Sequence, residues 1–306
     1  MINITDFDLR LLRIFKAVTD CGGFSAAESV LNLNLSTIST HMADLEARIG
    51  IRLCQRGRGG FQLTDEGKVL YQATAELLNS VEDFRVELGA LHHRISGELR
   101  IGIVDNTITD ANSKVAHAIL SMKRRGGDLQ INLAVQSPGE IEEALLARKI
   151  HVGIGPFRHT LPGLDYEPAY SEKLLLYCGR PHPLFSSAPY QLELDQLTDL
   201  DYVARGYLRE SHILGKTVHF KVSAMVHHME AAALLILSGG FIGYLPEHYA
   251  ARWVTQDQLR PLRPDLFGQC AEFFIVTQKN RSHSMAVQYF IDALRSASIS
   301  DVPEEM

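Results

Sequence analysis

The chain has 306 residues, which is too long for one small domain and fits two or three. Its composition, 46% hydrophobic and 22% charged, is typical of a folded globular protein and excludes an intrinsically disordered chain. The net charge of −6 excludes a uniformly basic protein, so any contact with nucleic acid must come from a local patch.

The sequence indicates neither secretion nor membrane insertion. Its first ten residues lack a basic start followed by an apolar run, and the most apolar run, Ala231–Leu237, is too short to span a bilayer. Four cysteines lie far apart without a CxxC pair: Cys21, Cys54, Cys178 and Cys270. This pattern favours a reducing compartment, and buried inert thiols over a redox-sensing thiol. We therefore expect a cytoplasmic protein without a membrane partner.

Two helices are predicted at the start of the N-terminal region. The first covers Asp8–Thr19, with Asp8 as its N-cap and apolar residues at helical spacing on one face. A pair of glycines at positions 22–23 ends it. The second begins with a capping box, S-x-x-E, formed by Ser25 and Glu28.

A third helix is predicted over Leu35–Ile49, with Asn34 as its N-cap. Its apolar residues recur at steps of three and four and face inward. The other face carries short hydroxyl side chains and an imidazole: Ser36, Thr37, Ser39, Thr40 and His41. Such side chains can reach base edges in a DNA groove, and the N–H groups that begin a helix can bind a phosphate. By itself, this segment fits an ordinary amphipathic surface helix equally well.

A basic, glycine-rich segment follows directly. Residues 48–64 carry four arginines and no acidic residue: Arg48, Arg52, Arg56 and Arg58. Glycines at positions 57, 59 and 60 predict a tight turn between two short strands. Its position after two consecutive helices favours a hairpin whose Arg56 and Arg58 contact the DNA backbone over a solvated charged loop.

Five runs in this region resemble the LysR-type transcriptional regulators, in the same order: DLRLLRIFKAV, GGFSAAESVL, STIS, LEARIGIRL and RGRGGFQLTDEG. The resemblance implies a winged helix-turn-helix DNA-binding domain over residues 1–64 and a dimerising linker helix over 65–92. It also implies a two-lobed effector-binding domain over 97–306. The implied partners are a two-fold-related site on double-stranded DNA, a small-molecule effector, further copies of the chain in a homodimer or homotetramer, and RNA polymerase.

The sequence departs from the family pattern at three positions. Leu35 and Thr40 stand where many members have Gln and Arg, both frequent DNA contacts in that pattern, and Cys54 stands where Phe is usual. Base-edge contacts must therefore fall more heavily on the remaining hydroxyl residues and His41.

The predicted linker helix carries a heptad seam. Four residues recur every seven positions, and three more recur with an offset of four: Leu70, Leu77, Phe84 and Leu91, then Thr74, Val81 and Leu88. Such a seam favours pairing with a second copy over packing of the helix on its own domain. A dimer also supplies two recognition helices for a two-fold-related site.

Beyond residue 97, alternating strands and helices predict an α/β arrangement. The strands are expected at Leu99–Val104, Gln130–Val135, His151–Ile154, Lys173–Cys178, Tyr202–Ala204, Phe220–Val222, Phe241–Pro246 and Ala271–Thr277. The helices are expected at Asn112–Arg124, Glu140–Ala147, His227–Ser238 and Met285–Ala297. The resemblance implies two Rossmann-like lobes, as in periplasmic binding proteins. Lobe I covers about 97–168 and 268–300, and lobe II about 169–267.

Ligands of such sheets bind at the carboxyl ends of the strands, between the lobes. This rule predicts an effector site built from Asp105, Asn106, Thr107, Gln136, Ser137, Arg205 and Gly206. Arg205 is the only cation of this set and could pair with a carboxylate, while Asp105 disfavours a purely anionic effector. Each residue could instead be an ordinary cap or turn residue.

No catalytic or metal-binding pattern stands out. His212, His219, His227 and His228 lack the spacing of metal ligands, so neither a metal nor another cofactor is expected. The sequence has no nucleophile elbow, P-loop or H-E-x-x-H. We therefore expect a DNA-binding transcriptional regulator controlled by an effector, and no enzyme. The alternative is a two-lobed solute-binding protein or enzyme with an N-terminal interaction module.

Overall fold

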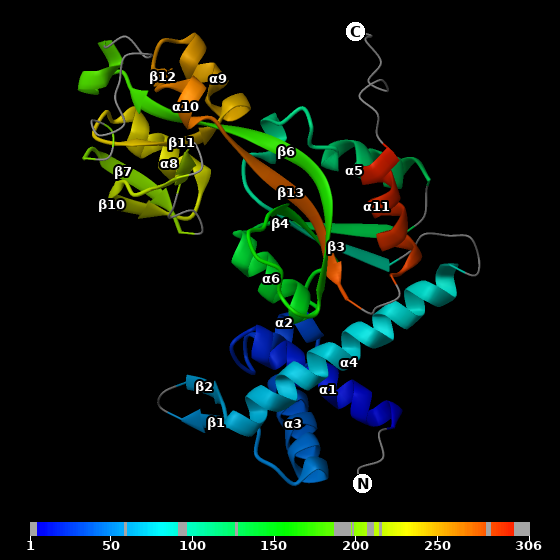
Figure 1. Ribbon diagram of the computed structural model, residues 1–306. Helices are drawn as coiled ribbons and strands as arrows, with labels where there is room; N and C mark the ends of the chain where they lie inside the picture. The colour runs from blue at the N-terminus through cyan, green and yellow to red at the C-terminus, as the bar shows by residue number, and fades with distance from the viewer. Residues whose placement is uncertain are drawn as a thin grey trace. The chain divides into compact units, whose positions relative to one another are not determined.

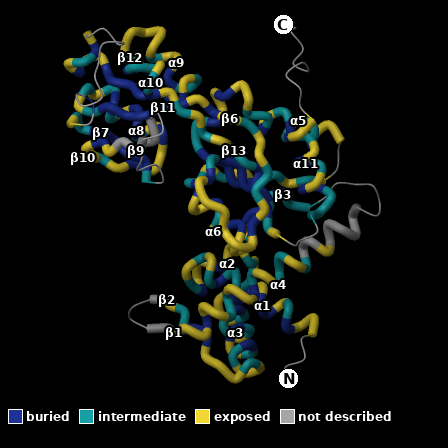
Figure 2. The backbone as a smooth tube through the Cα atoms, viewed as in Figure 1, coloured by how far each residue is buried: buried dark blue, intermediate teal, exposed yellow. Residues whose placement is uncertain are grey.

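The computed structural model describes residues 5–57, 60–90, 97–125, 128–186, 197, 199–206, 211–213, 216–279 and 283–296. The chain forms two compact units, Met1–His93 and Arg94–Met306, and each has its own hydrophobic core (Figures 1 and 2). Within the described residues, no helix is both long and apolar enough to cross a bilayer.

The first unit consists of helices and a two-stranded hairpin (Figure 1). Its elements are α1 (Asp6–Asp20), α2 (Ala27–Leu31), α3 (Leu35–Ile49), β1 (Cys54–Gly57), β2 (Gly60–Leu63) and α4 (Asp65–Ala90). The inward faces of α1 and α3 meet in a core that includes Phe15, Ile38 and Met42, all fully buried. The predicted bounds of the third helix are confirmed, and the Asn34 side chain accepts a hydrogen bond from the N–H of Thr37 at 2.8 Å.

The start of the first helix differs from the prediction. Thr5, in extended conformation, precedes α1, and Asp8 lies inside its first turn. The Asp8 carboxylate accepts hydrogen bonds from the Thr5 N–H at 2.8 Å and the Thr5 hydroxyl at 2.7 Å. It also forms an ion pair with Nε of Arg48, 2.5 Å away. Asp8 therefore joins the beginning of α1 to the end of α3 and is not an N-cap.

The capping box predicted for the second helix is wrong. Helix α2 begins at Ala27, after a turn, and no side chain caps it. The Glu28 carboxylate instead accepts the N–H of Leu35, at 2.6 Å, across the turn between α2 and α3. Glu28 thereby caps the next helix, because that helix presents an unsatisfied N–H group within its reach.

In the linker helix α4, the first residues of the heptad seam are packed within the same unit. Leu70 and Leu77 pack against the core of this unit, and Thr74 is 1% exposed. Farther along, Phe84 is 59% exposed. The side chains of Leu88 and Leu91 lie outside the described residues. Among the described seam residues, it is therefore the later part that is open for a second copy of the chain.

The second unit is built on one mixed sheet (Figure 1). Its strands are β3 (Gly97–Ile103), β4 (Leu129–Val135), β5 (Val152–Pro156), β6 (Leu164–Gly179), β7 (Asp201–Arg205), β10 (Lys221–Val226), β11 (Ile242–Pro246), β12 (Leu259–Pro261) and β13 (Gln269–Gln278), with a separate hairpin of β8 (Ser211–Ile213) and β9 (Lys216–Val218). Its α-helices are α5 (Val115–Arg124), α6 (Pro138–Leu146), α8 (Met229–Leu237), α9 (Glu247–Thr255), α10 (Pro264–Phe267) and α11 (Met285–Ser296), and its 3₁₀ helices are η1 (Thr107–Thr109) and η2 (Pro183–Ser186).

The sheet order is β10-β7-β11-β6-β13-β5-β3-β4, with β12 paired to β6. Strands β3, β4 and β5 are parallel to one another and belong to lobe I, whereas β7, β10 and β11 are parallel and belong to lobe II. The long strands β6 and β13 pair antiparallel from Leu174↔Gln269 to Leu164↔Gln278 and pass from one lobe to the other. Two lobes with predominantly parallel strands, joined by crossovers, confirm the predicted fold class.

Most predicted strands and helices of the second unit are present, whereas the short elements β8, β9, β12, α10, η1 and η2 were not predicted. Two larger features were also missed. The prediction placed a strand only at Lys173–Cys178, whereas β6 begins at Leu164. Helix α9, which starts directly after Pro246, was not predicted. Both features contribute side chains to the boundary between the lobes.

The Asp8 contacts predict an acid-sensitive first unit. Hydrogen bonds from the Thr5 side chain and backbone, followed by Arg48, lower the pKa of Asp8 from 3.8 to about 2. Since this pKa is depressed by folding, its stabilising contribution is present above the unfolded pKa and is lost as the pH falls from about 4 to about 2. Asp8→Asn should flatten the pH dependence of thermal unfolding in this window, measured by far-UV circular dichroism. The matched control is Asp6→Asn, in the same turn but exposed, and equal pH profiles for both variants would contradict the role of Asp8.

Candidate DNA-binding surface and effector site

The outer face of α3 presents the predicted DNA-contacting residues to different degrees. Ser36 and Thr40 are exposed, whereas Thr37, Ser39 and His41 are half-buried. The Ser36 hydroxyl donates to Oδ1 of Asn34, at 2.8 Å, and that of Thr40 donates to the carbonyl of Ser36, at 3.0 Å. Both oxygens can still accept hydrogen bonds from an external partner.

Two neighbouring features modify this face. Leu35 is 42% exposed, which adds an apolar contact suited to a thymine methyl group. Nδ1 of His41 is buried and has no hydrogen-bond partner among the described residues, so this nitrogen does not face a groove.

The expected phosphate site at the N-terminus of α3 is not supported. Of the N–H groups in its first turn, that of Leu35 is bound by Glu28 and that of Thr37 by Asn34. The carboxylate of Glu28 also places a negative charge where a phosphate would bind. Contacts with the DNA backbone must therefore come from elsewhere.

The hairpin β1–β2 lies directly beyond α3 in the sequence and is fixed to it. The Glu46 carboxylate accepts the N–H of Leu53 at 2.7 Å and that of Cys54 at 3.3 Å. Phe61 of β2 packs edge-on against Phe24, with ring centroids 5.8 Å apart. These contacts hold the base of the hairpin beside the helix-turn-helix.

The basic residues of the hairpin are only partly described. The backbone of Arg56 pairs with Phe61 in the β1–β2 ladder, but its side chain and all of Arg58 lie outside the described residues. Arg52 is exposed. Arg48, counted in the same basic segment, is neutralised by Asp8 and adds little to a DNA-facing patch.

In the second unit, the loop after β3 reaches from lobe I to lobe II. The Asp105 carboxylate accepts the N–H of Met229, the first residue of α8, and lies 3.8 Å from Nδ1 of His228. Asn106, with a φ of +59°, donates from Nδ2 to Oε1 of Glu172 at 3.2 Å. The structure therefore brings these two predicted residues to the boundary between the lobes.

Other predicted residues also lie at this boundary. Ser137 caps α6, and hydrogen bonds from its backbone and hydroxyl, with His228 and His227 nearby, lower the pKa of Glu140. A side chain at Gly206 would meet the imidazole of His227 at 3.0 Å. The ends of β4 and β7 and the start of α8 thus come close together.

The remaining three predicted residues are turned inward. Thr107 and Arg205 are buried. Oε1 of Gln136 is buried without a hydrogen-bond partner among the described residues and lies 3.0 Å from the Cβ position of Gly102 in β3, so Gln136 packs onto the sheet of lobe I. The side chains of these three residues therefore pack inside the protein, beneath the boundary between the lobes.

A cavity of about 220 Å³ lies within lobe I, and none of the predicted effector residues lines it. Arg295 and Glu167 are among its lining residues, and their ion pair of 2.5 Å lowers the pKa of Glu167. Tyr170 and Leu294 supply part of the remaining lining.

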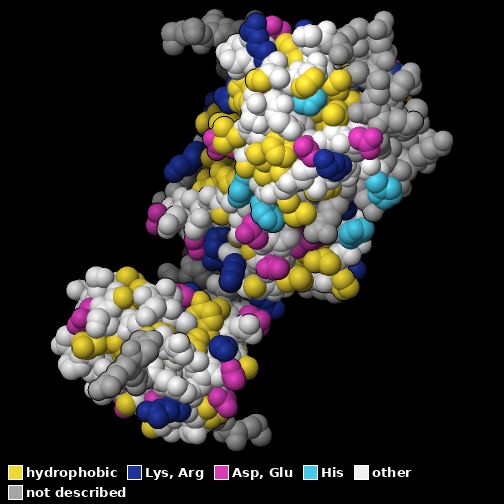
Figure 3. All heavy atoms as spheres, turned by 90° about the vertical axis from the view of Figure 1, so that its left-hand side faces the viewer, with side chains coloured by type: hydrophobic (Ala, Val, Ile, Leu, Met, Phe, Trp, Pro, Cys, Tyr) yellow, Lys and Arg dark blue, Asp and Glu magenta, His cyan; other side chains and the backbone are white. Residues whose placement is uncertain are grey.

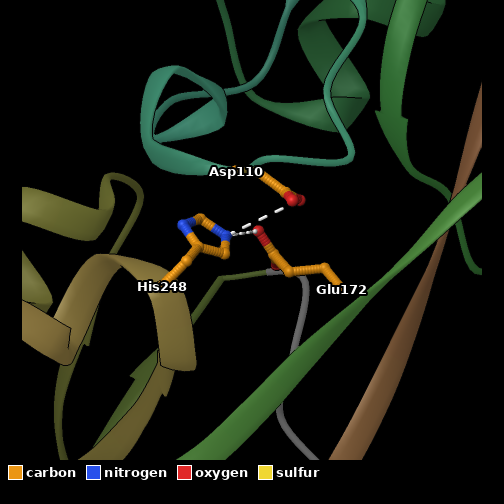
Figure 4. A group of neighbouring side chains, drawn as sticks. All are labelled: Asp110, Glu172 and His248. Carbon is orange, nitrogen blue, oxygen red and sulfur yellow. Dashed lines mark hydrogen bonds and ion pairs between the residues drawn. The ribbon is translucent and has the colours of Figure 1, made fainter. Parts of the chain in front are cut away.

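One group of side chains at the boundary between the lobes was missed by the sequence analysis, because no spacing pattern marks it. Asp110, Glu172 and His248 come from three separate segments and point toward one another (Figure 4). Histidine and acidic side chains also lie close together on the face of the larger unit that Figure 3 presents.

The four cysteines have different environments. Cys54 and Cys178 are buried, as predicted, and burial raises the pKa of Cys178 to about 12, which disfavours its reactive thiolate. Cys21 is half-buried and Cys270 is exposed, so the prediction of buried thiols is wrong for Cys270.

The chain is similar to known regulators over nearly its whole length. Residues 9–68 match the family model described as bacterial regulatory helix-turn-helix protein, lysR family, and residues 92–298 match the LysR substrate binding domain. The chain is 45% identical over 291 residues to the HTH-type transcriptional activator BauR of Pseudomonas aeruginosa, covering 95% of each protein.

Solved structures share the fold at low sequence identity. The full-length virulence activator AphB of Vibrio cholerae is 17% identical with a TM-score of 0.57, over 94% of this chain and 99% of that one. Full-length CbnR in complex with its target DNA is 19% identical with a TM-score of 0.63, over 94% and 98%. The two family models and the 45% identity to BauR establish that the chain belongs to the LysR family of helix-turn-helix transcriptional regulators and is not an enzyme.

Proposed function

We propose that this protein is an effector-controlled transcriptional regulator that binds a two-fold-related DNA site as a homodimer or homotetramer. The observation that carries the proposal is the hydroxyl-bearing outer face of α3 beside a hairpin fixed to the same helix. A solved structure of the fold neighbour CbnR contains its target DNA, and BauR is named a transcriptional activator. We propose activation here too, with RNA polymerase as a partner, and we place the protein in the cytoplasm because its DNA target is there.

The recognition helix and the wing have different roles in this proposal. Ser36 and Thr40 offer their hydroxyls to base edges, and Thr37, Ser39 and the rest of the His41 ring complete that surface. Arg56 and Arg58 bind phosphates on both sides of the groove and fix the position of α3 on the duplex.

The effector binds between the lobes, where Asp105, Asn106 and Ser137 of lobe I lie near Gly206 and the start of α8 in lobe II. Asp105 bonds a backbone N–H at the start of α8, so a ligand that competes for this contact changes how the lobes are held. That change alters the spacing of the DNA-binding units in the oligomer.

The role of the wing is testable through salt dependence. In Arg56→Ala/Arg58→Ala, affinity should fall on specific and nonspecific DNA alike, and the slope of log K against log salt should fall by about one for each phosphate that is no longer neutralised. Fluorescence anisotropy over a salt series measures both. Lys123→Ala/Arg124→Ala removes the same charge from the exposed end of α5 and should leave both unchanged. A wing variant with the parent slope would refute the proposed role.

The role of the seam is testable at its exposed end. Phe84→Glu should weaken self-association, measured by sedimentation velocity, because a buried charge in a coiled-coil seam is strongly unfavourable. Val69→Glu is the matched control, since Val69 is 68% exposed on the same helix and outside the seam. Leu77 is unsuitable for this test because it packs in the core of its own unit. An oligomer that survives Phe84→Glu would place the dimer interface elsewhere.

The effector site is testable by filling it. A reporter strain grown on different carbon and nitrogen sources identifies the compound that changes wild-type expression. Gly206→Val, which pushes against His227, should abolish this response and keep DNA binding without the compound. Gly240→Val is the control, because only one atom lies within 4 Å of its Cβ position, at 3.6 Å. An unchanged response in Gly206→Val would exclude this position from the effector site.

A further inference from the structure

Two carboxylates and one imidazole meet where the lobes join (Figure 4). Asp110 follows η1 in lobe I, Glu172 lies on the crossover strand β6, and His248 is the second residue of α9 in lobe II. Nε2 of His248 is 3.0 Å from Oε1 of Glu172 and 3.7 Å from Oδ2 of Asp110. One donor atom from each residue lies within 4.8 Å of the other two.

The charges of this group are not balanced. The side chains of Asp110 and Glu172 are only 3% and 2% exposed. In the part of the chain that the structure describes, neither forms an ion pair with a lysine or arginine. Buried charges are costly unless they are paired. One imidazolium balances a single negative charge, whereas a divalent cation balances both.

The hydrogen bonds around the group satisfy Glu172 but not Asp110, because Nδ2 of Asn106 donates to Oε1 of Glu172 at 3.2 Å. Oδ1 of Asp110 accepts the N–H of Asn112, but the buried Oδ2 has no hydrogen-bond partner among the described residues. This unpartnered oxygen belongs to a side chain that is almost fully buried and faces His248 (Figure 4). An unsatisfied buried acceptor at this position is the second indication that a cation belongs there.

The orientation of His248 supports the same conclusion. Nδ1 of His248 is hydrogen-bonded to the hydroxyl of Thr109, 2.8 Å away, and that hydroxyl is also 3.2 Å from the carbonyl oxygen of Asn106. This contact orients the ring so that Nε2 faces the two carboxylates. A second ring nitrogen that is fixed by a hydrogen bond is the usual outer contact of a metal-binding histidine, and it leaves Nε2 available to an ion between the carboxylates.

The spacing and chemistry of the donors indicate the class of ion. Around a tetrahedral ion with bonds of about 2.0 to 2.1 Å, neighbouring donor atoms lie about 3.3 Å apart. The observed 3.0 and 3.7 Å lie on either side of this value. An imidazole nitrogen with two carboxylates suits a first-row transition ion, whereas Mg²⁺ and Ca²⁺ favour oxygen donors alone.

We propose that Asp110, Glu172 and His248 form a binding site for a divalent first-row transition-metal ion, with Zn²⁺ the tightest-binding colourless member of that class to test. The ion links lobe I, the crossover strand and lobe II through one donor from each. Metal binding at this site can be measured without DNA, and the site departs from the sequence prediction that no metal is bound.

The test is a titration of the full-length protein with ZnCl₂ by calorimetry after removal of metals with a chelator. Cys21 and Cys270 are not buried and could bind zinc themselves, so the titration uses the Cys21→Ser/Cys270→Ser background. One Zn²⁺ per chain is expected. His248→Ala and the isosteric Asp110→Asn should each lower its affinity by about tenfold or more. His159→Ala and His219→Ala, at exposed histidines outside the group, should leave it unchanged.

A spectroscopic measurement covers the case in which a variant fails to fold. Co²⁺ bound to the parent protein should give visible d–d bands without a thiolate charge-transfer band, because the proposed donors are nitrogen and oxygen. Circular dichroism and mobility-shift assays on the same preparations report folding and DNA binding separately. The proposal is overturned if the parent binds no stoichiometric Zn²⁺, if the Co²⁺ spectrum shows sulfur donors, or if folded His248→Ala and Asp110→Asn retain the parent affinity.

Discussion

The antiparallel pairing of β6 with β13 is the constraint on which the larger unit depends. These strands run through both lobes, so the two parallel-stranded halves form one hydrogen-bonded sheet. The two lobes are joined by these two strands. Side chains at the boundary between the lobes therefore make the other contacts that set the separation of the lobes. One such contact joins the Asp105 carboxylate to the backbone N–H of Met229 at the start of α8. Another joins the side chains of Glu172 and His248. A ligand or an ion at this boundary therefore acts directly on the geometry of the lobes.

Carboxylates have the corresponding role in the smaller unit. Asp8 joins α1 to α3, Glu28 joins α2 to α3, and Glu46 joins α3 to the hairpin. Each of these acids accepts hydrogen bonds from another element, which fixes α3 relative to its neighbours. A chain with a net charge of −6 can thus keep an outer face of hydroxyl groups next to an arginine-bearing hairpin.

Sequence patterns succeeded where the signal was local. The apolar residues that recur every three or four positions, together with the Asn34 N-cap, predicted the bounds of α3 correctly. Both signals depend on residues within one or two turns of each other. They failed where a side chain had a choice of partners. Asp8 and Glu28 were assigned to the nearest helix ends, but Asp8 belongs to the interior of a first turn that starts after Thr5, and Glu28 reaches an N–H seven residues away. The heptad pattern is present, yet the core of the same unit absorbs Leu70, Thr74 and Leu77.

The sequence by itself determined the family, the fold class and the bounds of α3, because these follow from periodicity and from motifs contiguous in the chain. Only the tertiary structure decided which residues meet between the lobes. The Gln136 side chain packs onto the sheet of lobe I, whereas Asp110, Glu172 and His248 lie together although they belong to distant segments of the chain. Neither outcome leaves a local signature, because long strand pairings bring these segments together and no spacing in the sequence reports them.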